Sequence, residues 1–421
     1  MGRNSRKAWW IGCLLLGVLP TLSFAQDSLT VPIKPLRLSF TVKELGKVSV
    51  SLNVERQFGV AKSHRFYQGV ARFKRHSFPV AASENAKVFT LKFPGKVTGS
   101  RQSRQRLYGV RLGRNKAQVA SVPRSAMPEA ACSTMGASDV SHLSVVPEIS
   151  ARAKEVVKVI TLSAYTDPEW QFLHGASSDA DVVEAINTAE VIYNRQLGIR
   201  FRLNGITNLS SSTPETDPGE VLRTFRVIPE AQTESNLKSL FTGKDLDGQT
   251  IGIAYIGSLC WAKKYAYSTI QSYGLLTATI FAHEIGHNLG ATHDMSNIGT
   301  IMNTFINSGS PEFSAYSLGQ INTFIERFGS CLTTESVTPS LDQASLTLTK
   351  VGKSVVISLV SQRGIGIDGQ KIVYRVNGTV GSKTTSDLGV VKIRVRVKGK
   401  VTVKAKVAAS PTLSVKKRFR F

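Results

Sequence analysis

Four residues in the second half of the chain have the types and the spacing needed to bind a metal ion and move a proton. His283 and His287 are four positions apart, so on a helix both imidazoles leave the same face, one turn apart, and can bind one small cation. Glu284 follows the first histidine and can reach a water molecule on that cation without binding the cation itself. Gly290 then allows the chain to leave the helix and bring His293 back towards the same face.

The three histidines predict one catalytic zinc ion. Neutral imidazole is a good zinc ligand, and His283, His287 and His293 leave a fourth tetrahedral position for water, as catalytic rather than closed structural sites do. In that arrangement Glu284 is the candidate general base, which takes a proton as water attacks a peptide carbonyl and passes it to the leaving amine. The five-residue His-Glu-x-x-His pattern alone is weak evidence, because a helix can carry those residues for packing or solvation. Gly290, His293 and Asp294 at fixed offsets make coincidence improbable.

The residues around this motif alternate between predicted strands and helices. Apolar residues recur at helical spacing over 179–196, with Ser177 or Ser178 as a cap and Gly198 as a stop, and a second helix is predicted over 277–289. Strands are predicted over 156–162, 199–203 and 250–256. This order predicts an α/β domain over residues 155–335.

The chain begins with the pattern of a secretory signal peptide. Arg3, Arg6 and Lys7 precede an apolar run, and small residues end at Ala25, which predicts a signal peptide over residues 1–25 and an exported protein, secreted, periplasmic or at the cell surface. No later run approaches the length of a membrane helix, so no transmembrane segment is predicted. Residues 26–154 alternate apolar and polar in short runs and predict a β-rich region ending in a linker over 120–150.

The charge of the chain is unevenly distributed. Of the formal net charge of +24, residues 26–150 carry 20 Lys and Arg against 7 Asp and Glu, and residues 336–421 carry 17 against 3. Residues 151–335 are acidic, with 13 against 19. Apolar and polar residues alternate strictly over 391–397 and 401–407, with a turn at 398–400. This pattern predicts a hairpin with one β-branched and one basic face. The region 336–421 as a whole is predicted to form an immunoglobulin-like β-sandwich.

Residues 155–333 resemble the catalytic domain of the adamalysin (reprolysin) branch of the metzincins, the ADAM-like peptidases. The motif from His283 to Asp294 matches the metzincin pattern, and an aspartate after the third histidine is typical of that branch. Gly252 to Cys260 resembles the edge strand that binds the substrate backbone, and Phe313 to Leu332 resembles the last helix. The chain lacks the cysteine-rich modules that are common after such domains in animals. In this respect it is more similar to a bacterial secreted member of the family.

The resemblance implies a flattened α/β domain with a twisted sheet and a cleft, and it implies roles for further residues. Met302 in Thr300-Ile301-Met302 falls at the expected Met-turn, beneath the metal. A disulfide between Cys260 and Cys331 is implied, and closing such a loop would stabilise the fold by about 4 kcal/mol in the chain-entropy model. Two buried thiols are the alternative.

Cys132, the third cysteine of the expected mature chain, lies in the predicted linker. A thiolate is a good zinc ligand, so Cys132 is a candidate latency thiol that occupies the fourth position in the precursor. Its surroundings match no strong switch motif, and an unpaired cysteine or an intermolecular bridge is the alternative. A calcium ion is conceivable near Asp245 and Asp247, where a plain turn is the simpler interpretation.

Together these features predict a secreted zinc-dependent endopeptidase made as a zymogen, with proteins or peptides as substrates. The alternative function is that of an extracellular binding protein, in which the basic C-terminal region is the functional part and the zinc domain is a scaffold; the intact Glu284 argues against it. The basic region is expected to bind an anionic surface or polysaccharide, and no motif for specific nucleic-acid recognition is present.

Overall fold

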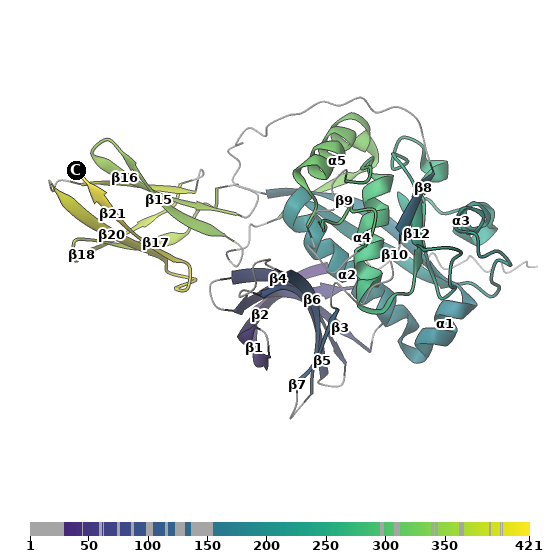
Figure 1. Cartoon of the computed structure of the whole chain (residues 1–421). Helices are drawn as coiled ribbons and strands as arrows, with labels where there is room; N and C mark the ends of the chain where they lie inside the picture. The colour runs from purple at the N-terminus through teal and green to yellow at the C-terminus, as the bar shows by residue number, and fades with distance from the viewer. Residues whose placement is uncertain are drawn as a thin grey trace, which may run out of the picture.

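The computed structural model describes most of the chain in four β-sheets and five α-helices (Figure 1). The predicted signal peptide and most of the predicted linker lie outside the described residues. Among the described helices none is long and apolar enough to cross a membrane. The described residues are 29–43, 45–58, 61, 63–73, 76–85, 88–97, 104–113, 117–122, 131–135, 155–294, 299–306, 312–337, 341, 344–361, 366–386, 389–395, 397 and 399–421.

The first seven strands form one antiparallel meander, in which each strand pairs with the next in the sequence. One face of the sheet carries an apolar cluster of its own, in which Val48, Leu52 and Tyr108 are buried. The strands are β1 (Leu29–Val42), β2 (Gly46–Gln57), β3 (Arg65–Phe73), β4 (His76–Asn85), β5 (Val88–Val97), β6 (Arg104–Leu112) and β7 (Ala117–Val122).

The central sheet has the strand order β10-β9-β11-β13-β12-β8, with β14 paired to β9. It is mostly parallel; β12 runs antiparallel to β13, and β14 antiparallel to β9. Every residue of β11 and β13 is buried, as expected for strands covered on both faces. The strands are β8 (Ala131–Met135), β9 (Glu155–Thr166), β10 (Ile199–Asn208), β11 (Leu237–Thr242), β12 (Thr250–Tyr255), β13 (Tyr267–Gln271) and β14 (Thr333–Val337).

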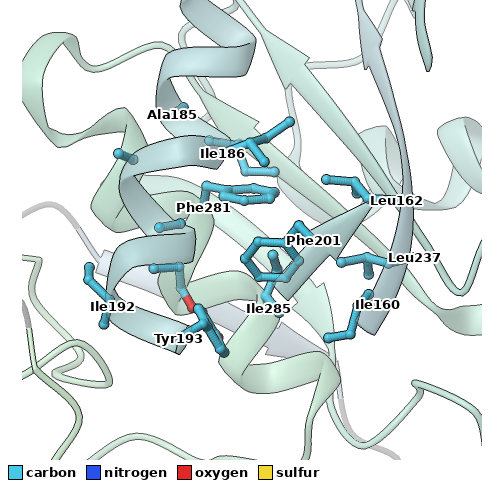
Figure 2. Packing of buried hydrophobic residues seen from close by; sticks show 14 of the residues in the cluster. Ile160, Leu162, Ala185, Ile186, Ile192, Tyr193, Phe201, Leu237, Phe281 and Ile285 are labelled. Carbon is cyan, nitrogen blue, oxygen red and sulfur yellow. The ribbon is translucent and has the colours of Figure 1, made fainter. Parts of the chain in front are cut away.

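Helices α2 and α4 pack on one face of this sheet, and α3 packs on the other. Figure 2 shows Ile186 and Tyr193 of α2 facing Phe281 of α4 and Phe201 of β10. The Tyr193 hydroxyl donates to the carbonyl oxygen of Ala282 at 2.7 Å and so fixes α2 against the helix that carries the histidine motif. The helices are α1 (Pro168–His174), α2 (Ser178–Leu197), α3 (Pro218–Val227), α4 (Thr277–Asn288) and α5 (Ala315–Phe328).

The boundaries of α2 agree with the predicted helix, and its N-cap residue is Ser177, one of the two predicted caps. The Ser177 hydroxyl makes no capping hydrogen bond, because it faces the carbonyl oxygen of His174 and the carboxylate of Asp181 instead, at 2.8 and 2.7 Å. Gly198 ends the helix at φ 65°, a left-handed conformation that glycine adopts without strain.

The C-terminal strands form two sheets, β15-β16-β19 and β18-β17-β20-β21, around one apolar core. The predicted hairpin is wrong: β19 pairs with β16, whereas β20 pairs with β17 and β21. Both strands bury an alternating β-branched face, and placing them in opposite sheets lets those faces cover each other. The strands are β15 (Ser345–Val351), β16 (Ser354–Val360), β17 (Lys371–Val376), β18 (Thr379–Thr384), β19 (Val390–Arg394), β20 (Lys400–Val407) and β21 (Ser414–Arg420).

The N-terminal sheet packs directly on α2, beside which it lies in Figure 1. Arg56 of β2 forms a buried ion pair with Glu190 of α2 at 2.7 Å, with side-chain exposures of 2% and 0%. Phe58 and Phe66 belong to the same apolar cluster as the residues under α2 and α4. The N-terminal region, which also has an apolar cluster of its own, therefore contributes Phe58 and Phe66 to the core of the central sheet.

Candidate metal centre

Helix α4 positions His283, Glu284 and His287, and all three side chains are fully buried. The helix stops after Asn288, and Gly290 turns the chain at φ 85°. A Cβ atom at Gly290 would lie 2.9 Å from the ring of Phe324, so both the backbone conformation and the space require glycine there. This turn returns His293 to the face of α4 that carries the other two histidines.

Backbone carbonyl groups set the orientation of the two helical imidazoles. The Nδ1 atom of His283 lies 2.6 Å from the carbonyl oxygen of Ile301, and Nδ1 of His287 lies 2.7 Å from that of Ala291. A carbonyl oxygen can only accept, so each Nδ1 carries the proton and each Nε2 keeps a lone pair. Hydrogen bonds of this kind hold the imidazoles of metal sites in one orientation.

The three Nε2 atoms converge on one point. His283 Nε2 lies 2.9 Å from His287 Nε2 and 3.3 Å from His293 Nε2, and all three candidate ligand atoms lie within 4.8 Å of one another. Two lone pairs facing each other at such distances repel unless a cation lies between them. The donor set of three neutral imidazoles fits zinc. Within the described residues this is the only group of three or more histidine, cysteine or acidic residues placed to hold a metal, and Asp245 and Asp247 belong to no such group.

Burial keeps the histidines neutral. Burial and, to a smaller extent, the nearby His293 lower the pKa of His283 to about 3, against smaller opposing effects of the Ile301 carbonyl and of Asp294. Burial likewise lowers the pKa of His287 well below its ordinary value and lowers that of the partly exposed His293. Neutral imidazole is the form that binds a metal ion.

The Glu284 carboxylate lies against strand β12. A Cβ atom at Gly252 would be 2.4 Å from Glu284 Oε1 and 2.7 Å from Ile280, so any other residue at position 252 would displace the carboxylate. Asn288 fixes the far end of α4 to the same part of the sheet, because its Nδ2 donates to the carbonyl oxygens of Tyr255 and Tyr267. Gly252 was expected only as part of the edge strand, and no signal in the sequence marked Asn288; the packing of α4 on β12 shows the contacts that both residues make.

Asp294, the aspartate after the third histidine, is hydrogen-bonded to three hydroxyl groups. Its carboxylate accepts hydrogen bonds from Ser314 at 2.6 Å, from Ser317 at 2.8 Å and from Thr300. Ser314 is the N-cap of α5. Asp294 therefore ties the turn around Met302 to the start of α5 and fixes the segment that carries His293.

Met302 lies directly under α4. It is fully buried, and a Cβ atom at Gly286 would meet its sulfur at 2.4 Å. Its carbonyl oxygen accepts from the backbone N–H of Asp294 at 2.8 Å. Gly286, between the two helical histidines, is thus the position at which the methionine fits against the helix.

Cys260 and Cys331 form a disulfide, with an S–S distance of 2.03 Å. Cys260 follows β12, and Cys331 follows α5. The bond therefore joins the segment after the strand beside Glu284 to the end of the helix whose first turn is hydrogen-bonded to Asp294.

Strand β8, within the predicted linker, pairs in parallel with β12. The Cα register places Cys132 opposite Gly252, the residue that contacts Glu284, and Thr134 opposite Ala254. Without β8, β12 would be the edge of the central sheet. The predicted linker thus contains a strand that covers the edge beside the candidate site.

Comparisons with known proteins find a family match that includes the histidine motif. Residues 179–294 match the model of the reprolysin-like metallopeptidases of family M12B. The zinc metalloproteinase-disintegrin-like proteins atragin and atrase-A, both of Naja atra, are 35% identical over 125 residues and 31% identical over 170 residues. These matches cover 27% and 37% of this chain, and the chain spans only 20% and 27% of the two relatives. A solved structure of a chaperone-substrate complex covers 40% of this chain and 35% of its own at 19% identity, with a TM-score of 0.32, which is too low to bear on the fold.

Proposed function

We propose that this chain, whose residues 179–294 match the reprolysin-like metallopeptidases, is an exported zinc-dependent endopeptidase that cuts peptide bonds in proteins. The observation that carries the proposal is the convergence of the Nε2 atoms of His283, His287 and His293 beside a buried glutamate. The three histidines would hold the zinc ion. The proposed organisation is a signal peptide (1–25), a pro-region (26–154), the metallopeptidase domain (155–335) and an accessory domain (336–421).

In this proposal Glu284 is the general base. Bound zinc would supply a Lewis acid that lowers the pKa of water and polarises a peptide carbonyl. Glu284 accepts a proton from the attacking water at its carboxylate and then gives it to the leaving amine. Gly252 leaves the space in which the carboxylate stays next to β12, and the backbone of β12 can hydrogen-bond an extended substrate once its edge is free.

The test is cleavage of an unfolded protein such as casein by the purified, processed chain, with zinc content measured on the same sample. Glu284→Gln keeps the size of the side chain and removes the base, so we expect activity to fall by about 10²–10⁴-fold while one zinc ion per chain is retained. The matched control is Glu326→Gln on the exposed side of α5, which should leave activity unchanged. Full activity of Glu284→Gln with zinc bound would refute the assigned role of Glu284. Cleavage that continues in the presence of a chelator would refute the requirement for a metal ion.

We propose further that the segment containing β8 keeps the precursor latent. Two features support this: β8 occupies the edge of β12 that a substrate would need, and its register sets Cys132 opposite the glycine beside Glu284. Cys132 is therefore the candidate thiol for the fourth zinc position.

Two variants of the unprocessed chain separate the thiol from the strand. Cys132→Ser should raise activity if the thiol binds the metal, with Ser133→Ala as its neighbouring control. Thr134→Pro removes an N–H from the parallel ladder and should raise activity if the strand blocks the edge. If activity stays low in both variants and rises only after proteolytic removal of residues 26–154, latency lies elsewhere in the pro-region.

A further inference from the structure

The outward face of the sheet β18-β17-β20-β21 concentrates cations. Along β20 the residues alternate strictly: Val401, Val403 and Ala405 are buried in the sandwich core, and the residues between them point outward. The pairing registers carry the same face across to β17 and β21. The exposed cations of this face, here called the basic face, are Lys371, Arg375, Lys400, Lys404, Lys406, Lys416, Arg418 and Arg420.

These cations stand directly opposite one another rather than beside acidic residues. Arg375 is opposite Lys404, which on its other side is opposite Lys416, and Lys400 is opposite Arg420. Directly opposed residues have Cβ atoms about 4.5–5.5 Å apart, and like charges at that spacing destabilise a sheet. Within the described part of the chain, none of the eight forms an ion pair with a carboxylate.

Protection of a sheet edge does not account for this arrangement. Lysine on an exposed edge strand prevents unwanted pairing, which would explain the charges of β21. However, β17 and β20 are interior strands of the sheet and carry five of the eight cations. Among the described residues of the opposite sheet, the outward-facing cations are Lys392 and Arg394 on β19, although this sheet belongs to the same sandwich. The charge is therefore placed on one face rather than spread for solubility.

We propose that the basic face binds a linear anionic polysaccharide whose carboxylate or sulfate groups repeat along the chain. Antiparallel strands and alternate residues place the cations on a regular grid, with steps of about 5 Å across the strands and about 7 Å along them. An extended polymer with one anionic group per sugar can contact several of these positions at once. This inference is independent of the proposed peptidase activity, since no member of the basic face lies in the candidate metal centre.

The side chains between the cations favour a polysaccharide over a single-stranded nucleic acid. They are Val373, Val380, Ser382, Thr384, Thr402 and Ser414, and none of the outward residues of this sheet is aromatic. Proteins that bind single-stranded nucleic acid stack its bases on aromatic side chains. Hydroxyl groups between cations can instead hydrogen-bond sugar hydroxyls.

The test measures binding of the full chain to polygalacturonate, which is carboxylated, and to dextran sulfate, which is sulfated, with neutral dextran as the blank. We expect binding to at least one anionic polymer, and the tighter of the two identifies the anionic group. Lys404→Gln with Lys416→Gln should weaken that binding by about fivefold and make it less dependent on salt. Lys392→Gln with Arg394→Gln removes the same charge from the opposite sheet and should change binding by less than about twofold.

Thermal unfolding of each double variant shows whether the sandwich remains folded. Equal weakening by the two pairs of substitutions would overturn the basic face as the binding site. Failure of the wild-type chain to bind either anionic polymer at low salt would overturn the proposal. Tighter binding to duplex DNA or to anionic lipid vesicles than to both polysaccharides would also overturn it.

Discussion

The two basic regions of the chain use their charge in opposite ways. Residues 26–150 and 336–421 have similar excesses of Lys and Arg. In the N-terminal sheet, the side-chain nitrogens of Arg56 and Lys92 each lie 2.7 Å from a glutamate oxygen of α2. Part of the positive charge is therefore neutralised between the sheet and this helix. On the basic face of the C-terminal sandwich no described carboxylate does so. Net charge alone therefore says little about function, because the position of the opposite charge decides whether a cation stabilises the fold or is available to a ligand.

The apolar cores of the two basic regions also differ in how far they are joined to the rest of the protein. The apolar cluster of the C-terminal sandwich contains only residues from 341 onwards. By contrast, Phe58 and Phe66 of the N-terminal region join the cluster that supports α4. Gln68 of β3 also donates hydrogen bonds to Asn187 and Glu190 of α2. The N-terminal sheet thus contributes to the support of the helix that carries the histidines, whereas the sandwich does not.

Replacement of Arg56 should have the largest effect. Arg56→Ala leaves the Glu190 carboxylate buried without its cation, which costs about 3–5 kcal/mol for a buried pair. Denaturant unfolding of the full chain measures it. Arg418→Ala, which removes an exposed arginine from the basic face, should change stability by no more than about 0.5 kcal/mol. Equal effects of the two substitutions would remove the distinction between the regions.

The ion pair between Lys92 and Glu184 should have an intermediate effect. Both side chains are slightly exposed, at 13% and 14%, and Glu184 also accepts from Ser83 at 3.0 Å. Lys92→Ala is expected to cost about 1 kcal/mol, close to the upper end for exposed pairs. A double-mutant cycle with Glu184→Gln isolates the coupling, which should decrease at high salt. A coupling near zero at low salt would show that this contact does not hold the sheet to α2.

Deletion of residues 342–421 should have the smallest effect on the rest of the protein. Because the sandwich has its own core, unfolding of the remaining chain should shift by less than about 0.5 kcal/mol, and casein cleavage should be retained. Fluorescence of the tryptophans reports on the remaining chain alone, since all four precede residue 342. A large loss of stability would instead show that the sandwich supports the central sheet.

The sequence predicted best what depends on short-range spacing. The four-residue spacing of His283 and His287 and the glycine at 290 are properties of one helix and its end. The approach of His293 to the other two histidines could therefore be anticipated from local geometry. Alternation likewise indicated that both flanking regions are rich in β-strands. Which strand pairs with which was not predictable in the same way: β19 and β20 look like a hairpin but lie in different sheets.

The tertiary structure alone decided the contacts between distant segments. Arg56 and Glu190 are 134 positions apart, and nothing in either local sequence marks them as partners. The same holds for β8 on the edge of β12 and for Gly252 beneath Glu284. Helical periodicity is set by hydrogen bonds between residues four positions apart, so it can be recognised in a short stretch of sequence. Strand pairing and buried ion pairs depend on the competition among all segments of the chain for the same edges and interior sites, and that competition is settled only when the chain packs as a whole.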